Sequence, residues 1–376
     1  MPKASTGNNL LALRRLGQSP WLDFISREFL ASGELKRLVE QDGVTGVTSN
    51  PTIFEKSIAS SSAYDTVIRR MAKEGKSAEE IYDVLTVADV GEAADVLSPV
   101  YRRTRGADGY VSIEVSPHCA HDTASTLDCA RRIFANLGRK NILIKVPATE
   151  EGASAIEELL VAGINVNATL IISLAHYERA AQAYFRALAR RQRQGLSLRQ
   201  IISFGSVFVS RIDTSVDKML DKLAAVEKDG SKAAAIKNLR GKAAVANSSI
   251  IYHRFRERFC DFTALTGARV QRVVWASTST KDPTYNDIKY VTELIGRKTV
   301  NTIPLATLKA FQDHGVARTA LGKGVEEATS VIKGLKSVGI DIDAVCQQIQ
   351  DEGVKAFADS YDTLIAAIEK KRLAFR

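Results

Sequence analysis

Short apolar segments alternate with longer amphipathic segments along most of the chain. Eight apolar segments have the length and composition of β-strands: 21–25, 43–50, 110–116, 141–148, 164–171, 201–208, 272–279 and 300–304. Helical periodicity fills many of the gaps between them. Ile156, Leu159 and Leu160, for example, fall on one face of a predicted helix. Strands that alternate with helices predict parallel βαβ units.

Eight such strands in a chain of 376 residues favour an α/β fold, a (β/α)8 TIM barrel with additional C-terminal helices. We expect a single domain over 1–376, with barrel strands from about 20 to 305. A helical extension from about 306 to 376 is expected to pack outside the barrel. A doubly wound open sheet is the alternative. It more often carries a glycine-rich phosphate loop, and neither GxGxxG nor GxxxxGK[ST] occurs in the chain.

The composition is that of an ordinary globular protein, with 45% hydrophobic and 25% charged residues. No run of eighteen apolar residues occurs, and the first residues lack the apolar core of a signal peptide. We therefore expect a cytoplasmic protein with no membrane partner. The four cysteines form no CxxC pair and no zinc-finger spacing, so we expect no metal: Cys119, Cys129, Cys260 and Cys346.

The net charge of +9 draws attention to anionic partners, from phosphorylated metabolites to nucleic acid. The densest basic stretch is RALARRQRQGLSLRQ, at 186–200. Its alternation with Gln and Leu favours the exposed end of a helix and a loop. No RNP, KH, helix-turn-helix or zinc-finger motif accompanies it, so we expect no nucleic-acid partner.

Polar residues interrupt or end nearly every predicted strand. In a (β/α)8 barrel the active site lies at the C-terminal ends of the strands, so polar residues there are candidate site residues. In strand order these are Asp23; Thr48, Ser49 and Asn50; Glu114; Lys145; Asn165, Asn167 and Thr169; Ser206 with Arg211 after it; and Ser277 to Lys281. Some of them have a plainer explanation as turn formers or helix caps, above all Asp23, Asn50 and 277–280.

Glu114 and Lys145 are harder to explain in that way, because each interrupts an apolar strand. A structural ion pair is one explanation, but a buried pair is weak evidence for stability. Schiff-base chemistry is the other. Desolvation lowers the pKa of a lysine, so the neutral amine can attack a ketone, and a carboxylate such as Glu114 can transfer the protons. Asp23 could then deprotonate a hydroxyl during cleavage of a carbon–carbon bond.

Five motifs follow one another along the chain: GVTSNPTIFEKSI, VSIEVSP, ILIKVPATEEG, GINVNATLIIS and SFGSVFVSRIDTSVD. Together they resemble the transaldolases, most closely the longer bacterial type. The resemblance implies a (β/α)8 barrel without a metal or organic cofactor. It also implies transfer of a dihydroxyacetone unit in the non-oxidative pentose phosphate pathway. There sedoheptulose 7-phosphate and glyceraldehyde 3-phosphate exchange with erythrose 4-phosphate and fructose 6-phosphate.

The resemblance also assigns catalytic roles to individual residues of the motifs. Lys145 is similar to the Schiff-base lysine of the family. Glu114 and Thr169 are similar to the pair that holds the catalytic water and passes protons. Asp23 is similar to the base that takes the hydroxyl proton in aldol cleavage.

Substrate binding is implied for a second set of residues. Asn50 and Asn167 resemble the amides that hold the dihydroxyacetone hydroxyls, with Thr48 beside them. Ser206 and Arg211 resemble the phosphate-binding pair, with Phe208 as the aromatic wall between them. Lys281 has two explanations, a second phosphate contact or a surface lysine.

Two other functions stay open at this stage. An enzyme of the same mechanism, similar to fructose 6-phosphate aldolase, would release free dihydroxyacetone. The outcome depends on how well the enamine is shielded from solvent. The second alternative is a non-catalytic barrel that binds sugar phosphate or RNA. A homodimer is likewise left open.

Overall fold

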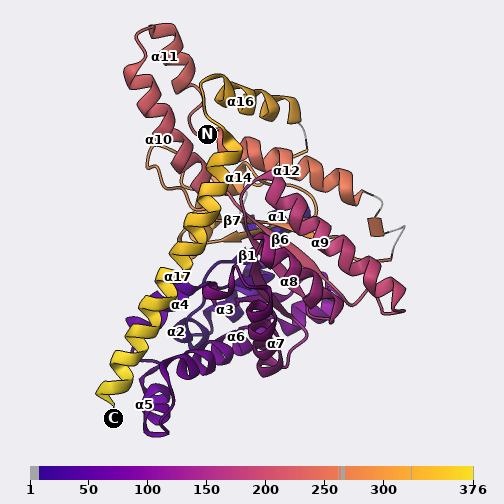
Figure 1. The fold of residues 1–376 in the computed structure, drawn as a ribbon, viewed down its shortest axis with the longest axis vertical. Coiled ribbons are helices and arrows are strands. Elements are labelled where there is room, and N and C mark those ends of the chain that lie inside the picture. The colour runs from indigo at the N-terminus through magenta and orange to yellow at the C-terminus, as the bar shows by residue number, and fades with distance from the viewer. Residues whose placement is uncertain (1–7, 261, 264–266, 323, 376) are drawn as a thin grey trace.

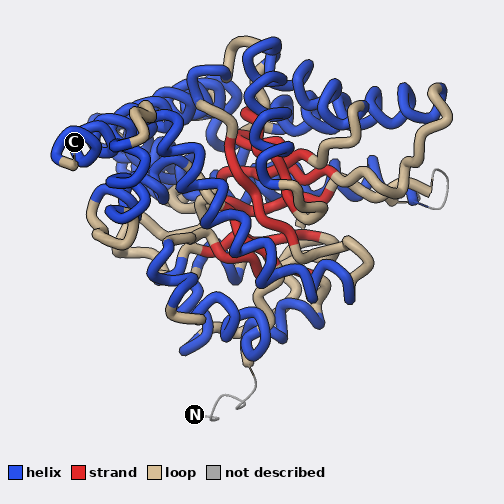
Figure 2. Tube along the Cα trace, turned by 90° about the horizontal axis from the view of Figure 1, so that it is seen from below, coloured by secondary structure: helices blue, strands red, loops and turns tan. Residues whose placement is uncertain are grey.

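The structure is a computed structural model that describes residues 8–260, 262–263, 267–322 and 324–375. Eight parallel strands close into a barrel in chain order, and β8 pairs with β1. The strands lie at the centre of the molecule (Figures 1 and 2). The strands are β1 (Gln18–Leu22), β2 (Gly46–Thr48), β3 (Tyr110–Glu114), β4 (Ile142–Pro147), β5 (Val166–Ile171), β6 (Ser203–Phe208), β7 (Arg272–Ala276) and β8 (Thr299–Ile303). The predicted (β/α)8 barrel is therefore confirmed.

Helices surround the strands, as Figure 2 shows in blue around red. α1 (Asn9–Arg15) precedes β1, and the helices between strands are α2 (Arg27–Ala31), α3 (Glu34–Arg37), η1 (Leu38–Asp42), α4 (Pro51–Ala59), α5 (Asp65–Lys73), α6 (Ala78–Arg103), η2 (Pro117–Cys119), α7 (Thr123–Leu137), α8 (Glu150–Val161), α9 (Leu174–Arg193), α10 (Ser210–Val226), α11 (Gly230–Lys237), α12 (Ala243–Phe259) and α14 (Lys289–Thr292). After β8 come α15 (Leu305–His314), α16 (Val325–Ser337) and α17 (Ile342–Ala374).

An apolar cluster fills the amino-terminal part of the barrel interior. Its buried members come from six of the strands and from the segment before β6: Trp21, Tyr110, Leu143, Ile202, Phe204, Val274 and Val300. Alternate residues of a strand point to the same side. The residue two positions further along a strand therefore also points inward. On several strands this residue is polar, for example Lys145 after Leu143 and Ser206 after Phe204. The apolar cluster thus supports a polar layer at the carboxyl ends of the strands.

The first strand lies earlier in the chain than predicted. β1 ends at Leu22, so the expected strand 21–25 is wrong by about three residues. Asp23 follows the strand, and its backbone N–H still donates to the Ile303 carbonyl at 2.9 Å. Asp23 does not cap the next helix either. That position belongs to Ser26, whose hydroxyl accepts from the Phe29 N–H at 3.2 Å.

α17, the long yellow helix of Figure 1, does not simply pack outside the barrel as predicted. The Gln350 side chain donates to the Leu170 carbonyl at 2.7 Å and to the Ala148 carbonyl at 3.4 Å, at the carboxyl ends of β5 and β4. Leu170 has a left-handed φ of 54°, within a register shift of β5 against β6. Such bulges turn the backbone locally, and here the Leu170 carbonyl meets α17. The C-terminal helix therefore reaches the mouth of the barrel.

The basic stretch at 186–200 is tied into the helical layer. Arg190 of α9 contacts Glu157 at 3.0 Å, and it forms a two-pronged pair with Glu158. Arg191 donates to the carbonyls of Leu160 and Val161 at the end of α8. Several of these cations therefore have partners within the protein. Across the described residues, none of the helices combines the length and apolar content that a membrane crossing needs.

Candidate active site

Lys145 and Glu114 face each other in the polar layer of the barrel. They are directly opposite in the β3–β4 register, so their side chains leave the sheet on the same side. Lys145 Nζ lies 3.5 Å from Glu114 Oε2 and donates to the Ser49 carbonyl at 3.4 Å. Only 4% of Lys145 and 6% of Glu114 are exposed. Burial raises the pKa of Glu114 to about 6, and the nearby Lys145 charge opposes part of that rise.

Thr169 lies close to this pair on β5. It is opposite Pro147 in the register, two residues beyond Lys145, and fully buried. Thr169 Oγ1 and Glu114 Oε1 are both buried without a hydrogen-bond partner among the described residues. Nearly all buried polar atoms in folded proteins have a partner, and the exceptions are frequently functional. Each of these two atoms is therefore available to a small polar ligand.

Asp23 enters the site from the end of β1. Thr48 donates its hydroxyl to Asp23 Oδ1 at 2.6 Å, and Thr48 Oγ1 lies 2.6 Å from Thr302 Oγ1. Burial raises the pKa of Asp23, while the Lys145 charge and the Thr48 hydrogen bond act in the opposite direction. A carboxylate with a raised pKa is a better proton acceptor than an exposed one, as a general base requires.

Asn50 and Asn167 differ in the hydrogen bonds that their side-chain amides already make. Asn50 caps α4, because its Oδ1 accepts from the Ile53 N–H at 3.0 Å, and it lines the cavity. Asn167 is buried between two strands, where it donates to Ser112 Oγ at 3.1 Å and accepts from Ser206 Oγ at 2.8 Å. The Ser206 hydroxyl is therefore directed to Asn167, whereas the resemblance grouped it with Arg211.

A cavity of about 300 Å³ opens over this layer. It brings together predicted residues that lie on or shortly after β1, β2, β4, β6 and β7. Its polar and charged lining includes Asp23, Thr48, Asn50, Lys56, Lys145, Ser206, Arg211, Ser277, Ser279, Lys281 and Thr302. Glu114, Asn167 and Thr169 do not line the cavity, and all three are buried.

One end of the cavity is positively charged. Arg211 of α10 lies over the ring of Phe208, with 5.6 Å between the guanidinium carbon and the ring centroid. Burial, together with the charges of Arg211 and Lys56, lowers the pKa of Lys281. Three cations thus converge, and such a cluster suits a phosphate group. Lys56 was not predicted, although it lies on the helix that follows Asn50.

A second unpredicted residue comes from the C-terminal helix. Phe357 of α17 lines the cavity and is 5% exposed. Its ring centroid lies 5.8 Å from Lys145 Nζ and 6.4 Å from the Phe208 ring. The apolar wall of the site is therefore shared between the barrel and the C-terminal extension.

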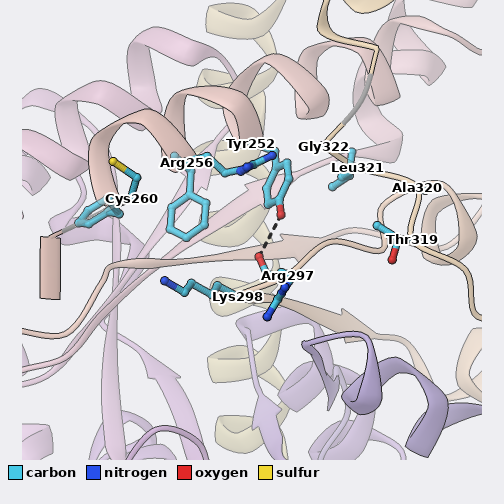
Figure 3. A pocket seen from close by; sticks show the side chains of 11 residues that line it. Tyr252, Arg256, Cys260, Arg297, Lys298, Thr319, Ala320, Leu321 and Gly322 are labelled. Carbon is cyan, nitrogen blue, oxygen red and sulfur yellow. Dashed lines mark hydrogen bonds between the residues drawn. The ribbon is translucent and has the colours of Figure 1, made fainter. Parts of the chain in front are cut away.

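A larger cavity, of about 590 Å³, lies elsewhere, beside α12 and the segment before β8 (Figure 3). Arg256, Arg297 and Lys298 border it, and the Tyr252 hydroxyl donates to the Arg297 carbonyl at 3.1 Å. None of the candidate site residues lines this cavity. Over the described part of the chain, no group of three or more His, Cys, Asp and Glu residues could hold a metal ion.

Comparison with known proteins points to one family. A model of the transaldolase/fructose-6-phosphate aldolase family matches residues 20–368, which include all of the barrel except the first two residues of β1, and most of α17. The chain belongs to this family. The resemblance of the five motifs is thereby confirmed for the chain as a whole.

Relatives within the transaldolase family cover nearly the full chain. Transaldolase 2 of a Nostoc species is 44% identical over 371 residues, which is 97% of both chains. The transaldolase of Thiobacillus denitrificans is 44% identical over 94% of this chain and 98% of its own. The transaldolase of Thermobifida fusca is 44% identical over 98% of this chain and 99% of its own. The matches to these transaldolases therefore include most of the C-terminal extension.

Proposed function

We propose that the protein is a transaldolase, which carries a dihydroxyacetone unit on Lys145 from a ketose phosphate to an aldose phosphate. The observation that carries this proposal is the buried Lys145–Glu114 pair, whose lysine lines a cavity with a cationic end. The exchange is that of sedoheptulose 7-phosphate and glyceraldehyde 3-phosphate with erythrose 4-phosphate and fructose 6-phosphate. The relatives are named transaldolases and match over nearly the full chain, which favours this function over a non-catalytic barrel.

In the first half-reaction the neutral Lys145 amine attacks the ketone carbon of the donor. The resulting carbinolamine loses water to give an iminium, which needs a proton on the departing oxygen. Glu114 supplies and recovers that proton, through a water that Glu114 Oε1 and Thr169 Oγ1 hold between them. Both atoms are buried with no other partner in the described structure, which supports this role.

Cleavage then requires a base at the other side of the substrate. Asp23 takes the proton of the hydroxyl next to the bond that breaks, and an aldose phosphate leaves. The electron pair of that bond remains on the Schiff base as an enamine. The enamine adds to the acceptor aldehyde, Asp23 returns the proton, and hydrolysis through Glu114 frees the product and Lys145.

Substrate hydroxyls and phosphate are held by other polar residues of the site. Thr48, Asn50 and Asn167 orient the dihydroxyacetone unit, with Ser206 fixing the amide of Asn167. Arg211 binds the phosphate, and Lys281 adds a second contact of the same kind.

Borohydride trapping tests the proposal directly. The protein is incubated with fructose 6-phosphate, reduced and digested, and the peptide containing 141–149 is read by mass spectrometry. We expect a three-carbon adduct on Lys145. A folded protein that gives no adduct on any lysine would support the non-catalytic barrel instead.

Asp23→Asn should block cleavage after the Schiff base has formed. Loss of a positioned general base lowers kcat by about 10²–10⁴-fold. Trapping of this variant should therefore yield a six-carbon adduct on Lys145 where the parent protein yields a three-carbon one. If the variant still gave mainly the three-carbon adduct, Asp23 would not be the base.

Arg211→Ala should weaken the binding of phosphorylated sugars specifically. A hydrogen bond to a charged group contributes about 1.5–3 kcal/mol, so KM for the donor should rise about 10–100-fold. Lys222→Ala removes a charge from the exposed part of the same helix and serves as the matched control. An equal loss with unphosphorylated dihydroxyacetone as donor would argue against a phosphate contact.

We further propose that the chain acts as one domain in the cytoplasm. Its barrel and α17 share the walls of one cavity, which supports a single functional unit. Sedimentation of the purified protein would distinguish a monomer from a homodimer.

A further inference from the structure

α17 is anchored across the mouth of the barrel at several points. Near its start, Gln350 is 2% exposed and donates to two carbonyls at the ends of barrel strands. Further along, Ser360 Oγ lies 2.9 Å from Thr52 Oγ1 on α4. At its end, Lys371 donates to the Ser61 carbonyl at 2.6 Å and lies 2.9 Å from Asp65. The helix is therefore a fixed wall of the site.

One face of α17 is shaped to approach the barrel closely. Gln350, Gly353 and Phe357 are buried and spaced three and four residues apart, so they share that face. A Cβ on Gly353 would lie 2.9 Å from Leu170 Cδ2, closer than side chains normally pack. Glycine therefore lets the helix come near enough for the next turn to place Phe357 over the site.

Phe357 is the part of α17 that lines the cavity. Its ring lies beside Lys145 Nζ, where the enamine forms in the proposed reaction, and packs edge-on against Phe208. Phe208 in turn contacts Arg211, so an apolar wall runs from the lysine to the phosphate end. This wall is apolar beside Lys145 and offers no proton there.

We propose that Phe357 determines how the enamine is partitioned, by keeping water away from its nucleophilic carbon so that the acceptor aldehyde reacts first. This inference rests on the proposed function and extends it. If water reaches the carbon, a proton adds there and an iminium forms. Hydrolysis of the iminium then releases dihydroxyacetone and the free Lys145 amine. The same intermediate thus gives transfer or release, according to the solvent at one side of it.

Truncation of the ring should shift this balance towards release. Phe357→Ala removes a six-membered ring from the wall and leaves room for several waters, each of which occupies about 30 Å³ in the liquid. With fructose 6-phosphate as donor, we expect the ratio of transfer to dihydroxyacetone release to fall by about tenfold, which corresponds to about 1.4 kcal/mol. In D₂O the released dihydroxyacetone should carry deuterium on carbon.

A graded series separates shielding from loss of structure. Phe357→Leu, Phe357→Val and Phe357→Ala should lower the ratio in the order of decreasing side-chain volume, and the first two serve if the alanine variant does not fold. Leu364→Ala is the matched control, because Leu364 is fully buried on the same helix but does not line the cavity. It should destabilise the protein and leave the ratio unchanged.

Two outcomes would overturn the inference. One is an equal loss of transfer and release along the series, which would mean that Phe357 only supports the fold. The other is a ratio that falls as much in Leu364→Ala as in Phe357→Ala. Borohydride trapping of each variant distinguishes failure of the shielding role from failure of the transaldolase mechanism. A three-carbon adduct with an unchanged ratio refutes the shielding role alone, whereas no adduct in the parent protein refutes the transaldolase mechanism.

Discussion

Lys145→Met should abolish measurable transfer while the barrel stays folded. Methionine keeps an unbranched apolar stem in the buried position but supplies no amine, so neither the carbinolamine nor the iminium can form. Single removals of a covalent catalyst lower kcat on the order of 10⁴–10⁶-fold. The measurement is the rate of sedoheptulose 7-phosphate formation from fructose 6-phosphate and erythrose 4-phosphate, with circular dichroism to verify the fold.

Glu114, the partner of Lys145, should allow the Lys145→Met variant to fold. Removing one member of a buried ion pair usually leaves the other charge uncompensated at a large cost. Here Glu114, with a pKa of about 6, can take up a proton and remain buried as a neutral acid. Lys140→Met, in the exposed turn just before β4, is the control and should keep full activity. Transfer by Lys145→Met at more than a tenth of the parent rate would rule out the Schiff base at this position.

The strands that carry this chemistry were predictable because they are buried on both faces. β3 and β4 are mostly apolar, so a charged residue such as Glu114 or Lys145 stands out against the cost of burying a charge. The register then places both at the same level, as neighbouring parallel strands of a barrel require. The order of strands around the barrel followed from the alternation with helices.

β1 was placed too late because its first half does not look like a strand. Gln18 and Ser19 are polar, and a proline at position 20 normally argues against a strand interior. In the structure, long-range side-chain contacts hold these residues in the strand, and no local sequence pattern reveals such contacts. Gln18, for example, is buried and donates to the Leu294 carbonyl at 2.7 Å and to Thr299 Oγ1 at 3.0 Å.

Lys56 and Phe357 were missed for a different reason. Both lie on helices, where periodicity shows which face is buried but not what covers it. Gln350, Gly353 and Phe357 are spaced as on any helix that packs against a neighbour. That this neighbour is the mouth of the barrel depends on long-range contacts, such as the bond from Gln350 to the Leu170 carbonyl. Only the folded chain brings Phe357 to Lys145.

Glu114→Gln should remove most activity and change its dependence on pH. Glutamine preserves the shape but cannot exchange a proton, and loss of such a group lowers kcat about 10²–10⁴-fold. In the parent protein, burial has raised the pKa of Glu114 to about 6 from an ordinary value of about 4.3. Above pH 6 the carboxylate can take the proton that Lys145 must lose. Below pH 6 the Glu114 carboxyl group is already protonated, so kcat/KM should fall about tenfold for each unit by which the pH decreases.

The substrate phosphate also titrates near pH 6, so the variant is needed to assign the acid limb. A limb that belongs to the phosphate persists in Glu114→Gln, whereas one that belongs to Glu114 disappears. Glu150→Gln, an exposed residue at the start of α8, should keep both the rate and the pH profile of the parent. An unchanged acid limb in Glu114→Gln, together with a kcat within tenfold of the parent, would mean that another group moves the proton. Because the pKa rise comes from burial, any change that admits water beside Glu114 should move the limb towards lower pH.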